Sequence, residues 1–197
     1  MHYYVTSAPD GLVAEEFVRD ADYVTLGLRG AVWSTDSPRW RSSASFCWGL
    51  RHDPDLRSRV TPADRDTAED AFHRFGGGEL PGEDALRAGF LEYEAIAAAP
   101  PLRLGAPVVP GGFHERRHYR VLFAGDGPAT LPADDRTTGS DHFSWELRRV
   151  GRDIAWALDV TALLATANGN TVGPVIDELI ATLHRQGLMP VTTERFA

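Results

Sequence analysis

The chain contains no lysine. All 20 residues of the Lys+Arg class are arginine. Without a lysine amine the protein has no residue for a Schiff base or a pyridoxal phosphate linkage, no lysine for a phosphate-binding loop and no Ser-Lys dyad. Enzymes that depend on such a lysine are therefore excluded.

Cysteine and long apolar runs are scarce as well. Cys47 is the only cysteine, which excludes an internal disulfide framework and a cysteine-based structural zinc site. No run of about 18 apolar residues occurs, and no basic-then-apolar leader follows Met1. These absences predict a cytoplasmic protein without a membrane segment.

The charge balance is acidic, with a formal net charge of −8. Nucleic-acid binding requires a continuous basic stripe, and the arginines of this chain are interrupted by acids. We therefore expect no nucleic-acid partner. An acidic surface suits solubility, and it also suits binding of a basic partner.

Periodicity in the sequence predicts both helices and strands. Four segments are expected to be helical: residues 11–20 with Asp10 as the cap, 62–75, 82–97 and 171–187. The glycines at 76–78 would join the second and third of these into a helical hairpin. Segments of β character are residues 2–6, 23–28, 31–34, 119–124, 142–150, 152–160 and 189–196. Alternation over 44–50 favours a strand, with a helix as the alternative.

Together these elements predict an α+β fold. We expect a mixed, mainly antiparallel sheet with helices packed on one face, and the helical hairpin in the first half. Residues 99–112 are rich in proline and glycine and predict a connector between a part at 1–98 and a part at 113–197. At 197 residues the two parts are expected to form one compact domain overall.

One short motif suggests a specific reaction. The segment His114-Glu115-Arg116-Arg117-His118 reads as H-E-x-x-H. In a helix its two imidazoles would stand one turn apart and share a zinc ion, with Glu115 activating a water. In a strand they would lie about 13 Å apart, too far for one metal. The preceding Pro-Gly-Gly and the strand-forming residues that follow favour the strand, so zinc at His114 and His118 is the alternative and no cofactor is the main expectation.

An extended segment would instead place polar side chains on one sheet face. On such a segment one face carries His114, Arg116, His118 and Arg120, and neighbouring strands can add His142, Glu146 and Asp159. Arg116, Arg120 and His142 suit a small anionic ligand. His118 with Glu146 or Asp159 suits acid-base catalysis. The same pattern is also typical of an ordinary solvated sheet face.

A second candidate surface is the segment Arg39-Trp40-Arg41. Tryptophan and arginine are the residue types that contribute most to protein interfaces, and we expect Trp40 to be exposed between its two arginines. The sequence therefore predicts a binding or accessory protein, immunity-like or biosynthetic, that uses the polar sheet face and this Trp/Arg segment. The alternatives are a small acid-base enzyme and a metal-dependent hydrolase built on the H-E-x-x-H string.

Overall fold

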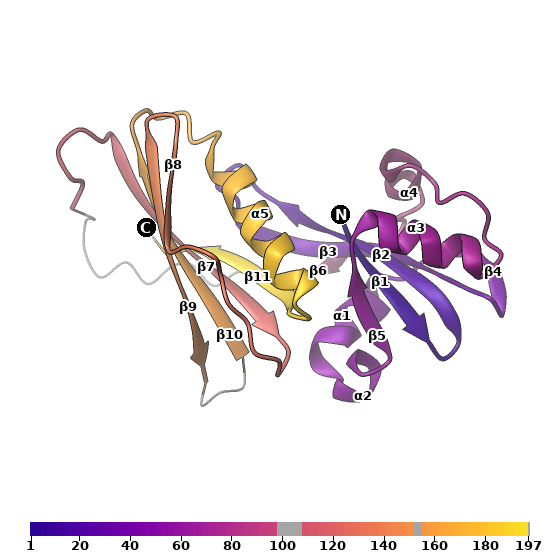
Figure 1. The fold of residues 1–197 in the computed structure, drawn as a ribbon. Coiled ribbons are helices and arrows are strands. Elements are labelled where there is room, and N and C mark those ends of the chain that lie inside the picture. Colours follow the sequence, from indigo (N-terminus) through magenta and orange to yellow (C-terminus); the bar gives the residue numbers. More distant parts are fainter. Residues whose placement is uncertain (98–107, 152–154, 197) are drawn as a thin grey trace. The chain divides into compact units, whose positions relative to one another are not determined.

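The computed structural model describes residues 1–97, 108–151 and 155–196. It divides into two compact units (Figure 1): unit 1 is Met1–Val18 with Leu26–Ala97, and unit 2 is Arg19–Thr25 with the chain from Ala98 onward. The predicted α+β class with antiparallel sheets is confirmed. Most of the predicted connector, residues 99–107, and residues 152–154 of one predicted strand lie outside the described residues.

Unit 1 is built on an antiparallel sheet of six strands. The order is β4-β3-β2-β1-β5, and β6 pairs separately with β3. The strands are β1 (His2–Ser7), β2 (Asp10–Arg19), β3 (Thr25–Ser34), β4 (Ser37–Ser42), β5 (Val60–Ala63) and β6 (Glu94–Ala95). Strand β2 lies in the centre of this sheet, and its side chains on both faces are buried.

Helices pack on both faces of the sheet. The helices of unit 1 are α1 (Ala44–His52), α2 (Pro54–Arg57), α3 (Arg65–Arg74) and α4 (Glu83–Ala88). Helix α3 packs Phe72 against Trp33 in the core of one face. Helix α1 lies on the other face, where Arg51 reaches Glu15. The expectation that helices pack on one face is therefore not met in unit 1.

Several predicted elements of unit 1 are wrong. Residues 11–20 form strand β2, not a helix, and residues 44–50 belong to helix α1, not a strand. Helix α3 begins at Arg65 with Asp64 as the cap, because residues 60–63 form β5. The predicted helix over 82–97 covers only Glu83–Ala88, so the helical hairpin is not confirmed.

Unit 2 contains an antiparallel sheet of five strands with helix α5 (Val172–Arg185). The sheet order is β11-β7-β10-β9-β8. The strands are β7 (Glu115–Ala124), β8 (Asp135–Thr138), β9 (Asp141–Val150), β10 (Ala155–Leu164) and β11 (Met189–Arg195). The predicted pairing of β9 with β10 is confirmed, with Leu147 opposite Leu158. Apolar residues of α5, including Ile176 and Ile180, pack with the core face of this sheet.

Unit 2 also includes a short segment from the first part of the chain, Arg19–Thr25. Tyr23 packs against its core, and the Asp22 carboxylate pairs with Arg195 at 2.5 Å. Thr25 accepts a hydrogen bond from the backbone N–H of Thr193 at 2.9 Å. Unit 2 is therefore discontinuous in sequence. Among the described residues, no helix combines the length and the hydropathy that crossing a membrane requires.

Candidate functional site

The H-E-x-x-H string lies on a strand, as the sequence predicts. Strand β7 begins at Glu115, and the backbone N–H of His114 bonds to the carbonyl of Leu164. At about 3.3 Å per residue an extended backbone separates the α-carbons of His114 and His118 by about 13 Å, so the helical spacing that a shared zinc ion required is absent. Within residues 1–97, 108–151 and 155–196, no three His, Cys, Asp or Glu side chains are arranged to hold a metal ion.

The polar face of the unit 2 sheet brings three charged residues together. Arg120 donates to Asp159 through Nε at 2.5 Å and through Nη2 at 3.0 Å. Arg148 donates to the same carboxylate at 3.0 and 2.9 Å. Burial alone would raise the pKa of Asp159, but the hydrogen bonds from both arginines lower it below its ordinary value. Asp159 is therefore held as a carboxylate and is a poor general base.

His118 and Glu146 share this face without meeting. His118 lies opposite Thr161, with Nδ1 at 3.0 Å from the threonine hydroxyl, whereas Glu146 lies opposite Asp159. Strand β10 lies between β7, which carries His118, and β9, which carries Glu146. Two strand spacings therefore separate β7 from β9 by roughly 9.5 Å. Burial lowers the pKa of His118, and the Arg116 cation lowers it further. The imidazole is thus mostly neutral at pH 7, and among the described residues its side-chain hydrogen-bond partner is Thr161, not a carboxylate.

The remaining predicted residues of this face, His142 and Arg116, each make a separate local contact. Nδ1 of His142 lies 3.4 Å from the hydroxyl of Thr137. Arg116 is half-buried and contacts the carbonyl of Val108 at 3.5 Å. Neither residue lines the pocket of unit 1 that is described below. The face is a set of local contacts rather than one enclosed site.

The Trp/Arg segment divides between the two faces of the unit 1 sheet. Trp40 is half-buried and stacks on Phe72, with ring centroids 5.9 Å apart and an interplanar angle of 28°. It therefore packs against the core instead of standing exposed. Arg41 lies opposite Val32 on the other face, and Arg39 is exposed. Arg41 lines a pocket there.

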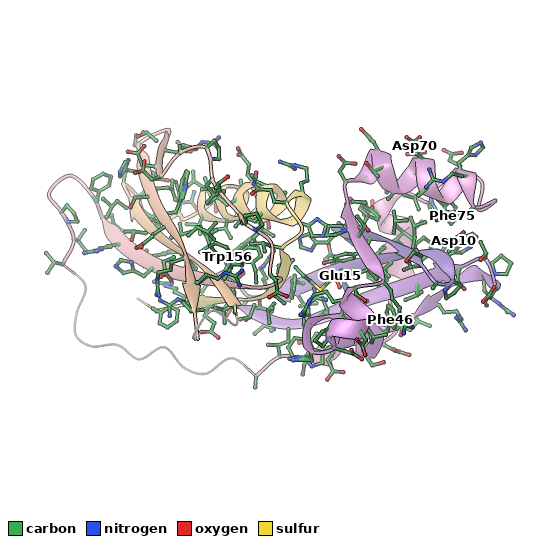
Figure 2. The ribbon with its side chains drawn as sticks, turned by 60° about the horizontal axis from the view of Figure 1, so that its bottom comes forward. Asp10, Glu15, Phe46, Asp70, Phe75 and Trp156 are labelled. Carbon is green, nitrogen blue, oxygen red and sulfur yellow. The ribbon has the colours of Figure 1, made fainter. Side chains whose placement is uncertain are left out.

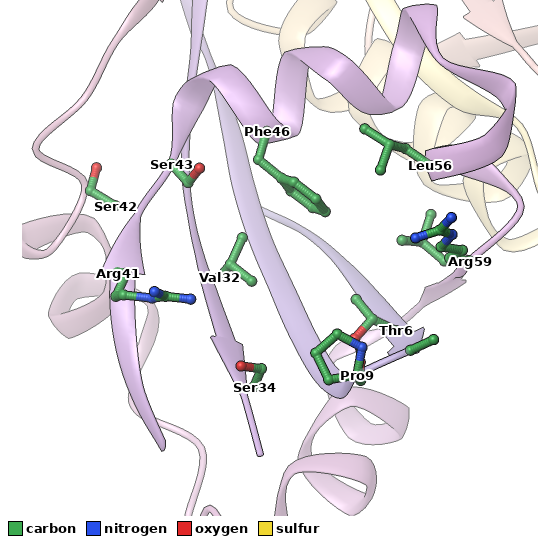
Figure 3. A pocket seen from close by; sticks show the side chains of 12 residues that line it. Thr6, Pro9, Val32, Ser34, Arg41, Ser42, Ser43, Phe46, Leu56 and Arg59 are labelled. Carbon is green, nitrogen blue, oxygen red and sulfur yellow. The ribbon is translucent and has the colours of Figure 1, made fainter. Parts of the chain in front are cut away.

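That pocket has a volume of about 420 Å³ (Figure 3). Its wall is mostly apolar and comes from the β1–β2 turn, β3, α1, α2 and β5. The apolar lining residues are Ala8, Pro9, Val32, Phe46, Leu56 and Val60. Its polar lining residues are Thr6, Ser34, Arg41, Ser42, Ser43 and Arg59. The pocket thus combines an apolar interior with two guanidinium groups.

Helix α1, which contributes Phe46 to this pocket, is held tightly to the sheet. Gly30 permits the approach, because a Cβ there would lie 2.6 Å from Sγ of Cys47 and 2.7 Å from the carbonyl oxygen of Ala14. Below the helix, Arg51 donates to the fully buried carboxylate of Glu15, which points toward the side of the sheet that carries Phe46 (Figure 2). The wall formed by α1 is therefore preformed.

The two arginines of the pocket are available for a ligand. Among the described residues, neither Arg41 nor Arg59 has a side-chain hydrogen bond or ion pair, although the chain has 28 acids. Ser34 is only 6% exposed, yet its hydroxyl has no partner within the described part of the chain. Cys47 is fully buried, and burial raises the pKa of its thiol, so it offers no nucleophile. The arrangement is suited to binding an anion.

The sequence identified only part of this site. Arg41 was found through its neighbour Trp40, whereas Arg59, Ser34 and Phe46 belong to no local motif and were missed. Comparison with protein-family models, curated proteins and solved structures finds no match for this chain.

Proposed function

We propose that the protein binds a small anionic ligand with an apolar body in the pocket of unit 1. The observation that carries this proposal is the apolar cavity of about 420 Å³ flanked by two guanidiniums that have no partner among the described residues. Ligand sites are typically concave, mostly apolar and roughly 300–1,000 Å³ in volume, with a few polar groups that orient the ligand. The pocket has each of these properties.

The two parts of such a ligand would be bound by different forces. Transfer of its apolar body from water to the pocket contributes about 25 cal/mol for each Å² buried. A guanidinium matches a carboxylate, sulfonate or phosphate with two parallel hydrogen bonds, which are stronger than those between neutral groups. Since the whole chain carries a net charge of −8, anions are not attracted by the overall field. Selection depends on the two arginines themselves.

This proposal retains the small anionic ligand predicted from sequence and moves it from the sheet face to the pocket. Arg41 of the predicted Trp/Arg segment is part of it. A protein partner, with an immunity-like or biosynthetic accessory role, stays a prediction. The acid-base alternative has no specific geometric support, because His118 lies apart from Glu146 and Asp159 is bound by two arginines.

The test uses a dye pair that differs only in charge. Anilinonaphthalene sulfonate has an apolar ring system with one anionic group, and N-phenyl-naphthylamine has the same rings without it. We expect the folded protein to bind the sulfonate at one site and to bind the neutral dye at least roughly tenfold more weakly, since a hydrogen bond to a charged group is lost. Fluorescence titration measures both affinities.

Two matched variants locate the site. Arg41→Met is expected to weaken binding of the sulfonate roughly tenfold without affecting the neutral dye. Arg39→Met removes the same charge from the same strand outside the pocket and should change neither affinity. Circular dichroism checks that both variants are folded. The proposal fails if the sulfonate does not bind, or if Arg41→Met and Arg39→Met bind it as tightly as the natural protein.

A further inference from the structure

The two guanidiniums of the pocket lie on opposite sides of it. Arg41 comes from β4 and Arg59 from the residue before β5, with Phe46 and Val32 between them (Figure 3). Resting on the proposed function, we infer that the ligand is a dianion whose two anionic groups are separated by a hydrocarbon spacer, as in an α,ω-dicarboxylate. Each arginine binds one end.

The Arg41 end is equipped with hydroxyl groups as well as charge. Ser34 and Ser43 lie on this side of the pocket (Figure 3). Ser34 is 6% exposed as a residue, but its hydroxyl is not among the buried polar atoms that lack a partner, and Ser43 precedes α1 without making a side-chain capping hydrogen bond. A carboxylate has two oxygens that accept from a guanidinium fork and still accept from hydroxyls. This end therefore provides the donors that one carboxylate needs.

The start of helix α1 is not part of the anion site. The N–H of Ala44 donates to Oε2 of Glu92 at 3.0 Å, so a carboxylate of the chain already occupies this helix end. The backbone N–H of Glu92 in turn donates to the hydroxyl oxygen of Ser42 at 2.7 Å. The ligand's first anionic group is consequently assigned to side chains, Arg41 with Ser34 and Ser43.

The Arg59 end offers charge with fewer supporting donors. Thr6 lies on this side, but its hydroxyl already donates to the carbonyl of Pro9 at 2.6 Å. Leu56 and Val60, the other neighbours of Arg59 in the lining, are apolar. A second carboxylate would therefore bind Arg59 alone, and its contribution should be smaller than that of the first. Binding strength is expected to be unequal at the two ends.

The middle of the pocket determines the nature of the spacer. Val32, Phe46 and Leu56 present no hydrogen-bonding side-chain atoms. A hydroxylated spacer, or one compact anion such as phosphate placed between the arginines, would lose hydration there without compensation. A hydrocarbon spacer loses nothing and gains burial. The ligand class is therefore an elongated dianion with an apolar centre.

A length series tests this inference by calorimetry. The dicarboxylates are succinate, adipate, suberate and sebacate, each compared with the monocarboxylate of the same carbon number, and inorganic phosphate is added as the compact anion. We expect one dicarboxylate length to bind at least roughly tenfold tighter than its monocarboxylate, and phosphate to bind more weakly than either. Arg59→Met should remove the dicarboxylate advantage, and it should weaken monocarboxylate binding less than Arg41→Met does. Arg41→Met should weaken both classes, and Arg39→Met neither.

The outcomes separate this inference from the proposed function. If the anionic dye binds as expected but dicarboxylates have no advantage at any length, the proposed function stands and the dianion inference is overturned. An advantage that survives in Arg59→Met, or phosphate as the tightest ligand, also overturns it. If neither the dye nor any carboxylate binds, both proposals fail.

Discussion

The carboxylate of Glu15 on β2 accepts hydrogen bonds from the guanidinium of Arg51 on α1, and neither side chain is exposed. The hydroxyl of Tyr4 donates to the same carboxylate at 2.9 Å. Arg51 also donates to the carbonyl of Cys47 at 2.5 Å within α1. Two full charges are thus buried together, and each depends on the other.

Loss of one partner should therefore be costly. We expect Arg51→Met to lower the free energy of unfolding by about 3–5 kcal/mol, because it leaves the Glu15 carboxylate buried without its counter-ion. The double variant Glu15→Gln with Arg51→Met should be less destabilised than Arg51→Met alone. Urea denaturation measures each value. Arg39→Met, an exposed control, should change stability by no more than about 0.5 kcal/mol. Strictly additive losses in the double variant would contradict this coupling.

Cys47 should be unreactive in the folded protein. Burial raises the pKa of its thiol, and the Glu15 carboxylate raises it further, so almost no thiolate forms at about pH 8. We expect dithionitrobenzoate to label the thiol only when urea unfolds the chain. Ser45→Cys places a second thiol at an exposed position of the same helix, and this one should react at once. Rapid labelling of the natural protein under native conditions would refute the prediction.

His118 should titrate below its ordinary range of about 6.5. Burial lowers its pKa and Arg116 lowers it further, while Asp159 opposes both. We therefore expect Arg116→Gln to raise the pKa and Asp159→Asn to lower it, as followed by histidine NMR. A pKa at or above the ordinary value, or no response to either substitution, would show that the described environment of His118 is incorrect.

The same shift makes a prediction about stability. Since the pKa of His118 is lower in the folded than in the unfolded chain, the unfolded chain takes up the proton first as the pH falls. The contribution of His118 to stability is thus unchanged above the unfolded pKa and becomes increasingly unfavourable as the pH drops from about 6.5 toward the folded value. His118→Gln should lack this part of the pH dependence in urea denaturation. An identical profile for both proteins would count against it.

The H-E-x-x-H string should bind no stoichiometric zinc. His118 lies on β7 and His114 directly precedes it, so an extended backbone places their α-carbons about 13 Å apart, too far for one ion. Protein purified without chelator is expected to contain well under one zinc per chain by elemental analysis. Added zinc should alter the melting temperature of the natural protein and of His114→Ala equally. One zinc per chain that disappears in His114→Ala would require a different structure for this segment.

Elements with a strong local pattern were predictable. The β9–β10 hairpin alternates large apolar and polar residues on two neighbouring strands, and α5 repeats apolar residues at helical spacing. Helix α1 was not predictable, because Ala44, Phe46, Trp48 and Leu50 alternate as a strand does. In the structure Arg51 of this helix pairs with Glu15, which lies 36 positions away in the sequence. Such a contact leaves no local signal.

Strand β2 shows the opposite difficulty. Its residues Leu12, Val13, Ala14 and Glu15 are all buried, because helices cover both faces of the sheet. A strand buried on both sides has no polar-apolar alternation to mark it. The pocket was missed for a related reason: its residues come from separate strands, helices and a turn, so only Arg41 stood out beside Trp40.

The segment Arg19–Thr25 affects how this protein can be dissected. A fragment that starts after the predicted connector would lack Tyr23, whose ring packs on the core of unit 2, and Asp22, which pairs with Arg195. Cutting the chain at its most obvious boundary would therefore remove part of the interior of the piece retained. An isolated second unit should be designed with residues 19–25 grafted back, for example by circular permutation.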